Sequence, residues 1–142
     1  MKLIMHGEGY PCQTLPASDG YIDTDYMGDC MSALVFTDEH DGTYRDVRGY
    51  HGLGGLEVVN WKSLLANIPI LQPMKLYIVG PGCLCSANRR KQTVQMVEIA
   101  LSESGLRAVE VCYFYEKSRM VFDRTATQVD PEAPGGGCCP IL

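Results

Sequence analysis

Two apolar segments of strand length, Met31–Phe36 and Met74–Val79, constrain the fold of this chain more than any other feature of the sequence. The first is followed by Thr37–Gly42 and the second by Gly80–Gly82, both rich in residues that favour turns. A short apolar run bounded by turn residues is typical of a buried strand. We therefore expect both segments to be strands in the core of a sheet.

The remaining strands are predicted from weaker patterns. Residues 43–50 alternate weakly between polar and apolar side chains and follow a turn, so we expect them to pair with residues 31–36 as a hairpin. Residues 109–115 and 119–122 predict a last hairpin that turns at 116–118. Residues 1–29 show no sustained period, which favours an irregular N-terminal layer.

Helical spacing of apolar residues occurs twice. Residues 58–68 have this spacing and stop before Pro69, a residue that ends helices. The strongest helix is expected at about 88–104, with Ser86 or Asn88 as N-cap and Gly105 as the C-terminal glycine. Its expected apolar positions are Val94, Val97, Ile99, Ala100 and Leu101.

These elements predict an α+β fold. Strands outnumber helices and hairpins dominate, so we expect mixed or antiparallel sheet layers in a β-sandwich-like core, with two main helices packed on the outside. A chain of 142 residues suits one compact domain, which we place at residues 1–130. The Pro- and Gly-rich residues 131–142 are expected to be a flexible tail.

Charge and hydropathy exclude several classes of function. A net charge of -5 argues against broad nucleic-acid binding, which needs a positive face for the phosphates. The basic run 89–91 is short and is expected on a helix surface. No apolar run is long enough to span a bilayer, and polar residues from His6 onward interrupt any signal-peptide core. We expect a soluble, cytoplasmic protein.

The 7 cysteines do not have the even number and regular spacing of a disulfide framework. Cys83 with Cys85 and Cys138 with Cys139 offer thiolates for zinc, but neither pair has the two- to four-residue gap of structural zinc sites. We therefore predict no metal, and no cofactor motif is present. Each cysteine is then either an inert core residue or a reactive thiol.

Cys30 is the strongest candidate for a reactive thiol. It stands at the start of a predicted strand, directly after the turn-prone Met27–Asp29. His51 ends the partner strand, so hairpin pairing brings an imidazole beside the thiol, and such a base activates cysteine as a nucleophile. Thr24 precedes the nucleophile on the incoming loop and can orient the imidazole. Taken one at a time, these residues also fit a buried cysteine, a strand-end histidine and an ordinary turn residue.

Together, these residues resemble the CheD-like protein-glutamine deamidases, a group that shares its Thr-Cys-His geometry with the cytotoxic necrotizing factor domains. The carriers of the resemblance are Thr24, Gly28–Cys30 and Tyr50–His51, in the order Thr, Gly-x-Cys, hairpin, His. It continues more weakly through Ser86–Arg89, Gly105–Leu106 and Val121–Asp123, so that it covers roughly residues 24–125. Asp29 stands where the family usually has a small residue, and the hairpin is longer than is typical.

The resemblance implies that residues 1–130 are a single catalytic domain with Cys30, His51 and Thr24 as catalytic residues. It implies an enzyme that converts a glutamine side chain of a target protein to glutamate and releases ammonia. The same acyl-enzyme chemistry supports transglutamination or proteolysis. The family includes bacterial toxins, so translocation into a host cell without an N-terminal signal is a further expectation for this chain.

Three alternatives stay open at the level of sequence. The chain can be a small papain-like cysteine protease, or a non-catalytic protein-binding module in which Cys30 lies away from His51. Cys12 with His6 is a second Cys/His pair, although no predicted element supports it. The C-terminal Cys139–Leu142 has the outline of a prenylation box beside Cys138, and lipidation there is the one route by which we expect membrane contact.

Overall fold

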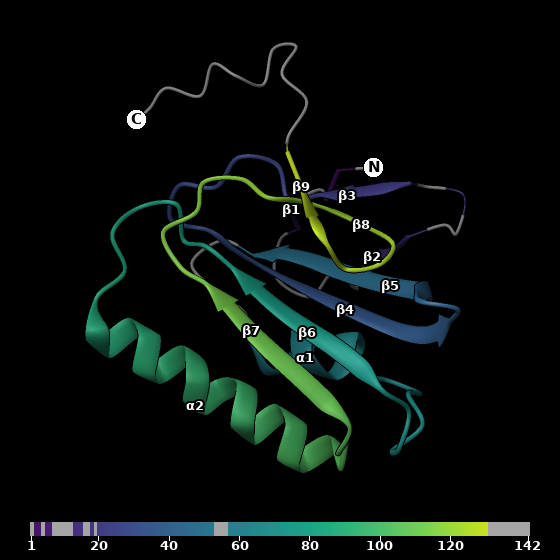
Figure 1. The fold of residues 1–142 in the computed structure, drawn as a ribbon. Coiled ribbons are helices and arrows are strands. Elements are labelled where there is room, and N and C mark those ends of the chain that lie inside the picture. The colour runs from purple at the N-terminus through teal and green to yellow at the C-terminus, as the bar shows by residue number, and fades with distance from the viewer. Residues whose placement is uncertain are drawn as a thin grey trace.

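A computed structural model gives the arrangement of the chain (Figure 1) and describes residues 2, 3, 5, 6, 13–15, 18, 20–52 and 57–130. Its strands come mainly in consecutive runs with the helices between them, which is the α+β arrangement that the sequence predicts. The strands are β1 (Met5–His6), β2 (Gln13–Leu15), β3 (Tyr21–Asp23), β4 (Met31–His40), β5 (Thr43–Gly52), β6 (Met74–Val79), β7 (Val109–Phe114), β8 (Val121–Asp123) and β9 (Gln128–Val129). The helices are α1 (Val58–Leu64) and α2 (Ala87–Ser104).

The β4–β5 hairpin is the centre of the larger sheet and confirms the hairpin prediction. The strands run further than the apolar pattern suggested and turn at Asp41–Gly42, whose φ angles of 55° and 82° suit a tight turn. Strand β4 also pairs antiparallel with β6, so it has neighbours on both edges. The sheet has the order β1-β5-β4-β6-β7, with β2 also pairing with β5.

The predicted last hairpin is wrong. Strand β7 pairs with β6 in parallel, whereas β8 pairs with β3 and β9 in a separate three-stranded sheet. Parallel neighbours require a crossover connection, and α2 provides it between β6 and β7. The turn-forming residues 116–118 fit a hairpin and also fit a connection between two sheets. The local pattern therefore predicted the wrong partner for both β7 and β8.

The N-terminal region is more regular than expected. Strand β1 pairs in parallel with β5, β2 pairs antiparallel with β5, and β3 pairs antiparallel with β8. These strands have only 2 or 3 residues each, too few to produce a visible period. The predicted tail at 131–142 lies outside the described residues.

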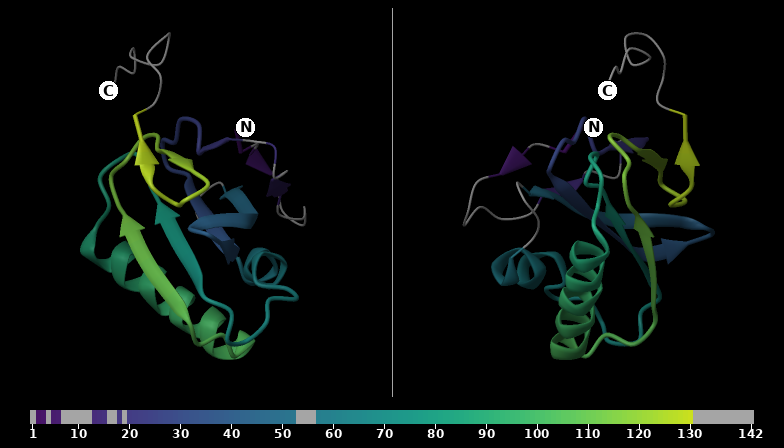
Figure 2. Two further views of the ribbon diagram at one scale, coloured as in Figure 1. Left: turned by 45° about the vertical axis from the view of Figure 1, so that its right-hand side comes forward. Right: turned by 90° about the vertical axis from the view of Figure 1, so that its left-hand side faces the viewer.

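Two hydrophobic cores lie on opposite faces of the larger sheet. Leu34 and Phe36 of β4 face the small sheet, where they join residues such as Phe122 of β8. Ala33 and Val35 face the helices, where Trp61 of α1 and Val97 of α2 pack. Figure 2 shows the resulting layers, with the small sheet on one side of the larger sheet and both helices on the other. Alternation along β4 thus divides the molecule into three layers.

Helix α2 confirms its predicted ends. The Ser86 hydroxyl accepts a hydrogen bond from the Arg89 N–H at 3.1 Å, and Gly105 closes the helix at a φ of 75°. Of the expected apolar positions, only Val97 is fully buried, and Ile99 is 54% exposed. Helix α1 ends at Leu64, earlier than the predicted 68. None of the described helices is long and apolar enough to cross a membrane.

Replacing Phe36 with alanine is expected to destabilise the fold by about 3–5 kcal/mol, because the ring is fully buried among the aromatic rings of the first core. Urea unfolding monitored by circular dichroism measures this loss. The matched control is Leu71→Ala, since Leu71 is 74% exposed and its truncation should change the free energy of unfolding by no more than about 0.5 kcal/mol. Equal losses for both variants would contradict the assigned core.

Candidate functional site

The hairpin register brings Cys30 and His51 to the same face of the larger sheet. His51 lies directly opposite Ser32 in the β4–β5 pairing, and Cys30 is two residues before Ser32. Residues directly opposite each other in an antiparallel pair share a face, so His51 points to the same side of the sheet as Ser32. Both side chains therefore point toward the small sheet, and Cys30 belongs to the core on that side.

The imidazole of His51 is held by the third predicted residue. Its Nδ1 lies 2.9 Å from the main-chain carbonyl oxygen of Thr24. A carbonyl oxygen only accepts hydrogen bonds, so Nδ1 must carry the proton and donate it. In the neutral ring, Nε2 then holds the lone pair. His51 is 2% exposed, and Nε2 has no hydrogen-bond partner among the described residues. The Nε2 lone pair is therefore buried and accepts no hydrogen bond from the described residues.

Thr24 orients the histidine through its main chain, whereas its hydroxyl is used elsewhere. The hydroxyl oxygen accepts from the Met120 N–H at 3.0 Å and donates to the Asp25 carbonyl at 3.1 Å. The Thr24 N–H donates in turn to the Met120 carbonyl at 3.0 Å. These bonds fix a fully buried residue between the loop after β3 and the start of β8. Any residue with the same backbone position would offer the same carbonyl to His51.

An ion pair anchors the segment that carries Thr24. Arg119 donates to both carboxylate oxygens of Asp23, at 3.0 and 2.7 Å, and both side chains are largely buried. Asp23 also accepts from the Asp25 N–H at 2.8 Å, which holds Asp25 in a left-handed turn with a φ of 60°. Burial alone would raise the pKa of Asp23, but the hydrogen bonds and charge of Arg119 outweigh it and lower the pKa.

The loop before Cys30 rests against the glycine-rich turn after β6. The N–H groups of Gly82 and Cys83 both donate to the Gly28 carbonyl, at 2.8 and 3.2 Å. A Cβ atom on Gly82 would lie 1.9 Å from the Met27 carbonyl oxygen, which is a severe clash. Gly80–Gly82 leads from β6 toward α2, and the missing side chain of Gly82 allows this turn to contact the cysteine loop closely.

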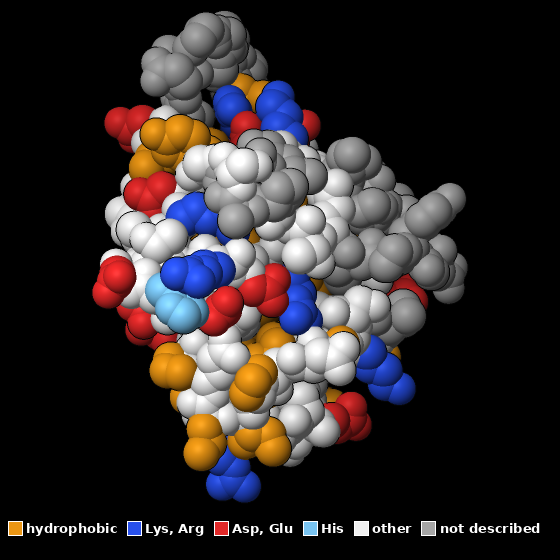
Figure 3. Space-filling view, turned by 90° about the vertical axis from the view of Figure 1, so that its right-hand side faces the viewer, with side chains coloured by type: hydrophobic (Ala, Val, Ile, Leu, Met, Phe, Trp, Pro, Cys, Tyr) orange, Lys and Arg blue, Asp and Glu red, His pale blue; other side chains and the backbone are white. Residues whose placement is uncertain are grey.

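Arg89, a residue that the sequence analysis placed only on a helix surface, contacts the same loop. From the first turn of α2 it reaches Asp29, donating to the carboxylate at 2.8 Å and to the backbone carbonyl at 3.0 Å. The next residue, Arg90, pairs with Glu116 at 2.9 Å. Both positions lie far from their partners in sequence, so no local pattern indicated these contacts. Figure 3 shows a further face on which basic and acidic side chains are intermingled.

Burial of the thiol limits what the site can do as it stands. Cys30 is 5% exposed and packs in the same core as Met27, which is 3% exposed. The Ser32 hydroxyl lies 3.4 Å from the Met27 sulfur, so this methionine packs on the sheet face that Ser32 and His51 share. A flexible thioether side chain can move at low cost. Because Cys30 is 5% exposed, a substrate would reach the thiol only after neighbouring groups had moved.

The other cysteines have different surroundings. Cys83 is exposed, Cys85 is 5% exposed, and no disulfide joins any cysteine that the structure describes. Burial raises the pKa of Cys112, with a further contribution from the charge of Glu110. No group of three or more His, Cys, Asp or Glu within the described ranges could hold a metal ion.

Three of the sequence candidates cannot be placed. Cys12, Cys138 and Cys139 lie outside the described residues. The pair of Cys12 with His6 and the prenylation box therefore stay alternatives.

Comparison with known proteins gives no relative for this chain. No family model, no curated protein and no solved structure matches it. The resemblance to CheD-like deamidases therefore rests on the motif residues in the sequence.

Gly82→Ala is expected to disturb the site, because the added methyl must push the Met27 carbonyl and the cysteine loop away. The expected destabilisation is about 1–3 kcal/mol, as for overpacked interiors, measured by urea unfolding. The rate of iodoacetamide labelling at Cys30 should also change, because the displaced loop leads directly into Cys30. Gly28→Ala is the matched control in the neighbouring loop, since a Cβ there meets no atom within 4 Å. Equal effects from both variants would refute the close contact.

The ion pair of Asp23 predicts a dependence of stability on pH. Because folding lowers the pKa of Asp23 below 3.8, its contribution is complete above that pH and is lost as the pH falls through the lowered value. Asp23→Asn should therefore reduce the loss of stability on acidification, measured as urea midpoints between neutral pH and the acid range. Asp130→Asn, at an exposed position, is the control and should leave the pH dependence unchanged.

Proposed function

We propose that this chain is a cysteine hydrolase that deamidates glutamine side chains of a target protein. One observation carries the proposal: the Thr24 carbonyl holds His51 in the tautomer that leaves Nε2 as a base, on the sheet face that also carries Cys30. A nucleophile, a base and a group that orients the base are the parts that covalent thiol catalysis needs. The motif resemblance described above supplies the choice of glutamine as the substrate.

In the first step His51 Nε2 takes the thiol proton, and the Cys30 sulfur forms a bond to the carboxamide carbon of the substrate. Negative charge moves onto the amide oxygen, where backbone N–H groups beside Cys30 stabilise it. The imidazolium then gives its proton to the amide nitrogen, the carbon–nitrogen bond breaks, and ammonia leaves. A thioester between Cys30 and the former glutamine remains.

In the second step His51 takes a proton from water, and the resulting hydroxide attacks the thioester carbon. The carbon–sulfur bond breaks, the thiol regains its proton from the imidazolium, and glutamate is released. An amine in place of this water would give transglutamination. Attack on a peptide bond in place of a carboxamide would give proteolysis of the papain type. The proposed partner is thus a protein, not a nucleic acid, and the chemistry needs no cofactor.

The proposal places the enzyme in the cytoplasm of a bacterium, or in a host cell as a toxin-type effector. Both settings are reducing, which suits a catalytic thiol. The acidic composition of the chain accords with the exclusion of nucleic acid as a partner.

The burial of Cys30 favours a second candidate function. A thiol that is 5% exposed and packed in the same core as Met27 is also what a non-catalytic protein-binding module of the same fold would have. In that case the contact between His51 and Thr24 would only join the two sheets. The two functions differ in whether the thiol reacts in the native protein.

Iodoacetamide labelling of the native protein across pH, with peptide mapping, tests the proposal directly. We expect Cys30 to be alkylated selectively near neutral pH, where an ordinary thiol with a pKa of about 8.5 is mostly protonated. His51→Gln should slow this labelling by roughly tenfold or more, since general bases contribute about 10²–10⁴-fold to such reactions. The exposed Cys83 provides an internal reference in every sample.

Incubation with a glutamine-containing peptide separates the possible reactions. Mass spectrometry should find the amide replaced by a carboxylate, and Cys30→Ser should abolish the change. Cleaved peptide would indicate proteolysis instead. Slow labelling of Cys30 that is indifferent to His51 would overturn the enzyme proposal and leave the binding module.

A further inference from the structure

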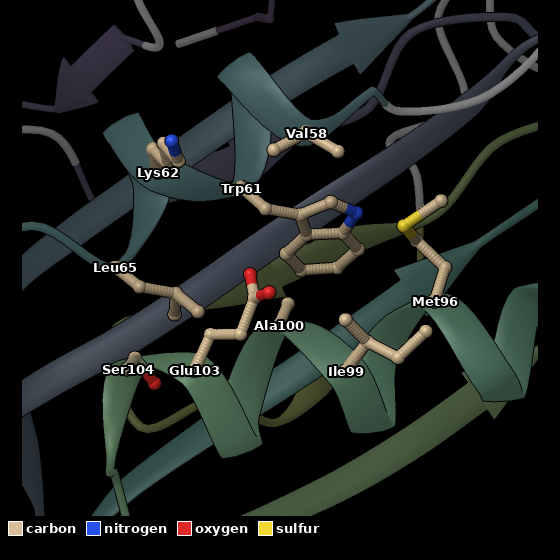
Figure 4. A pocket seen from close by; sticks show the side chains of 9 residues that line it. All are labelled: Val58, Trp61, Lys62, Leu65, Met96, Ile99, Ala100, Glu103 and Ser104. Atoms are coloured by element: carbon tan, nitrogen blue, oxygen red, sulfur yellow. The ribbon is translucent and has the colours of Figure 1, made fainter.

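A groove lies between the two helices, on the face of the larger sheet that is opposite to Cys30. It has a volume of about 210 Å³ (Figure 4). Its lining is mostly apolar and comes from α1, the residue that follows it, and the middle and end of α2: Val58, Trp61, Lys62, Leu65, Met96, Ile99, Ala100, Glu103 and Ser104. A cavity of about 150 Å³ in another protein holds benzene, so this space suits a molecule built on one ring.

Trp61 brings an unsatisfied polar group to this groove. The side chain is 4% exposed, and its indole Nε1–H has no hydrogen-bond partner among the described residues. A buried tryptophan N–H usually has an acceptor, because leaving it without one loses its hydration without compensation. In Figure 4 the nitrogen lies at the ring edge toward Val58 and Met96. An acceptor supplied by a ligand would satisfy it.

Charge at the groove restricts the acceptor. Two charged side chains of opposite sign, Lys62 and Glu103, line the groove. The Glu103 carboxylate is the one that points toward the Trp61 ring (Figure 4), and there it would repel a negative group beside the indole. A carboxylate or phosphate is therefore a poor ligand, whereas a neutral carbonyl oxygen is acceptable. The exposed side chains of Val58 and Ile99, at 53% and 54%, extend the apolar surface around the opening.

We propose that this groove binds a neutral small molecule with an apolar, single-ring body and one carbonyl oxygen, which accepts a hydrogen bond from Trp61 Nε1–H. The Nε1 atom is buried. The Met96 thioether lies toward the same edge of the ring (Figure 4), so this side chain moves aside when the ligand enters. Met96 is only partly buried, and an unbranched thioether changes rotamer easily. The site belongs to the helix-side core and is independent of the reaction proposed for Cys30.

The chain contains a single tryptophan, so one indole N–H signal in a nitrogen-15 NMR spectrum reports on this site alone. Acetophenone and ethylbenzene form a matched pair of probes that differ in the carbonyl group. Titration with acetophenone should move the indole signal in a saturable way. Ethylbenzene should bind roughly three- to tenfold more weakly, as expected for loss of one hydrogen bond.

Two variants should act in opposite directions. Met96→Ala uncovers Nε1 and should tighten acetophenone binding, whereas Ala100→Phe fills the groove and should abolish the saturable shift. Glu103→Gln should leave acetophenone binding in place and allow benzoate, which the wild-type protein should reject. Cys30→Ser should bind as the wild type does, which separates this site from the proposed catalysis.

Three results would overturn the proposal. The first is an indole signal that does not respond to acetophenone in the wild type or in Met96→Ala. The second is equal affinity for the two probes, and the third is unchanged binding in Ala100→Phe. Circular dichroism of each variant establishes that the fold is retained.

Discussion

The register between β4 and β5 is the constraint on which the candidate site and both cores depend. Side chains alternate along a strand, so a slip of one residue would move His51 to the helix side while Cys30 stayed on the other. The turn at Asp41–Gly42 sets this register at one end of the hairpin. Phe36, locked among aromatic rings of the first core, holds it further along. The contacts that stabilise the hairpin therefore also determine the geometry of the candidate site.

The candidate site is completed by a second layer of the protein. Thr24 follows β3, which belongs to the small sheet, and its carbonyl reaches across the layers to His51 on β5. The pair of Asp23 with Arg119, and the bonds between Thr24 and Met120, hold β3 to the start of β8. His51 is oriented in this way only while the two sheets are packed together, so the proposed chemistry depends on the whole fold.

The sequence was sufficient for the features that local pattern determines. The β4–β5 hairpin, the caps of α2 and the placement of Cys30 and His51 on one face all follow from short-range spacing. Contacts between segments that are distant in the sequence could not be predicted from local patterns. The parallel pairing of β6 with β7, and the reach of Arg89 to Asp29 across 60 positions, depend on the packing of elements that look alike in isolation. Thr24 was predicted to orient the imidazole, but its use of a main-chain carbonyl could not be read from its side chain.

Two buried nitrogens without partners among the described residues mark opposite faces of the same sheet. His51 Nε2 lies in the core toward the small sheet, and Trp61 Nε1 lies in the core toward the helices. Buried polar atoms are nearly always hydrogen-bonded, because an unbonded one loses its hydration without compensation. We expect a protein to retain such an unbonded atom where the atom has a function. A histidine lone pair kept free can accept a proton from a thiol, and an indole N–H kept free can donate to a ligand. The two faces of the central sheet thus support separate proposals, each resting on one atom whose partner is missing from the described part of the chain.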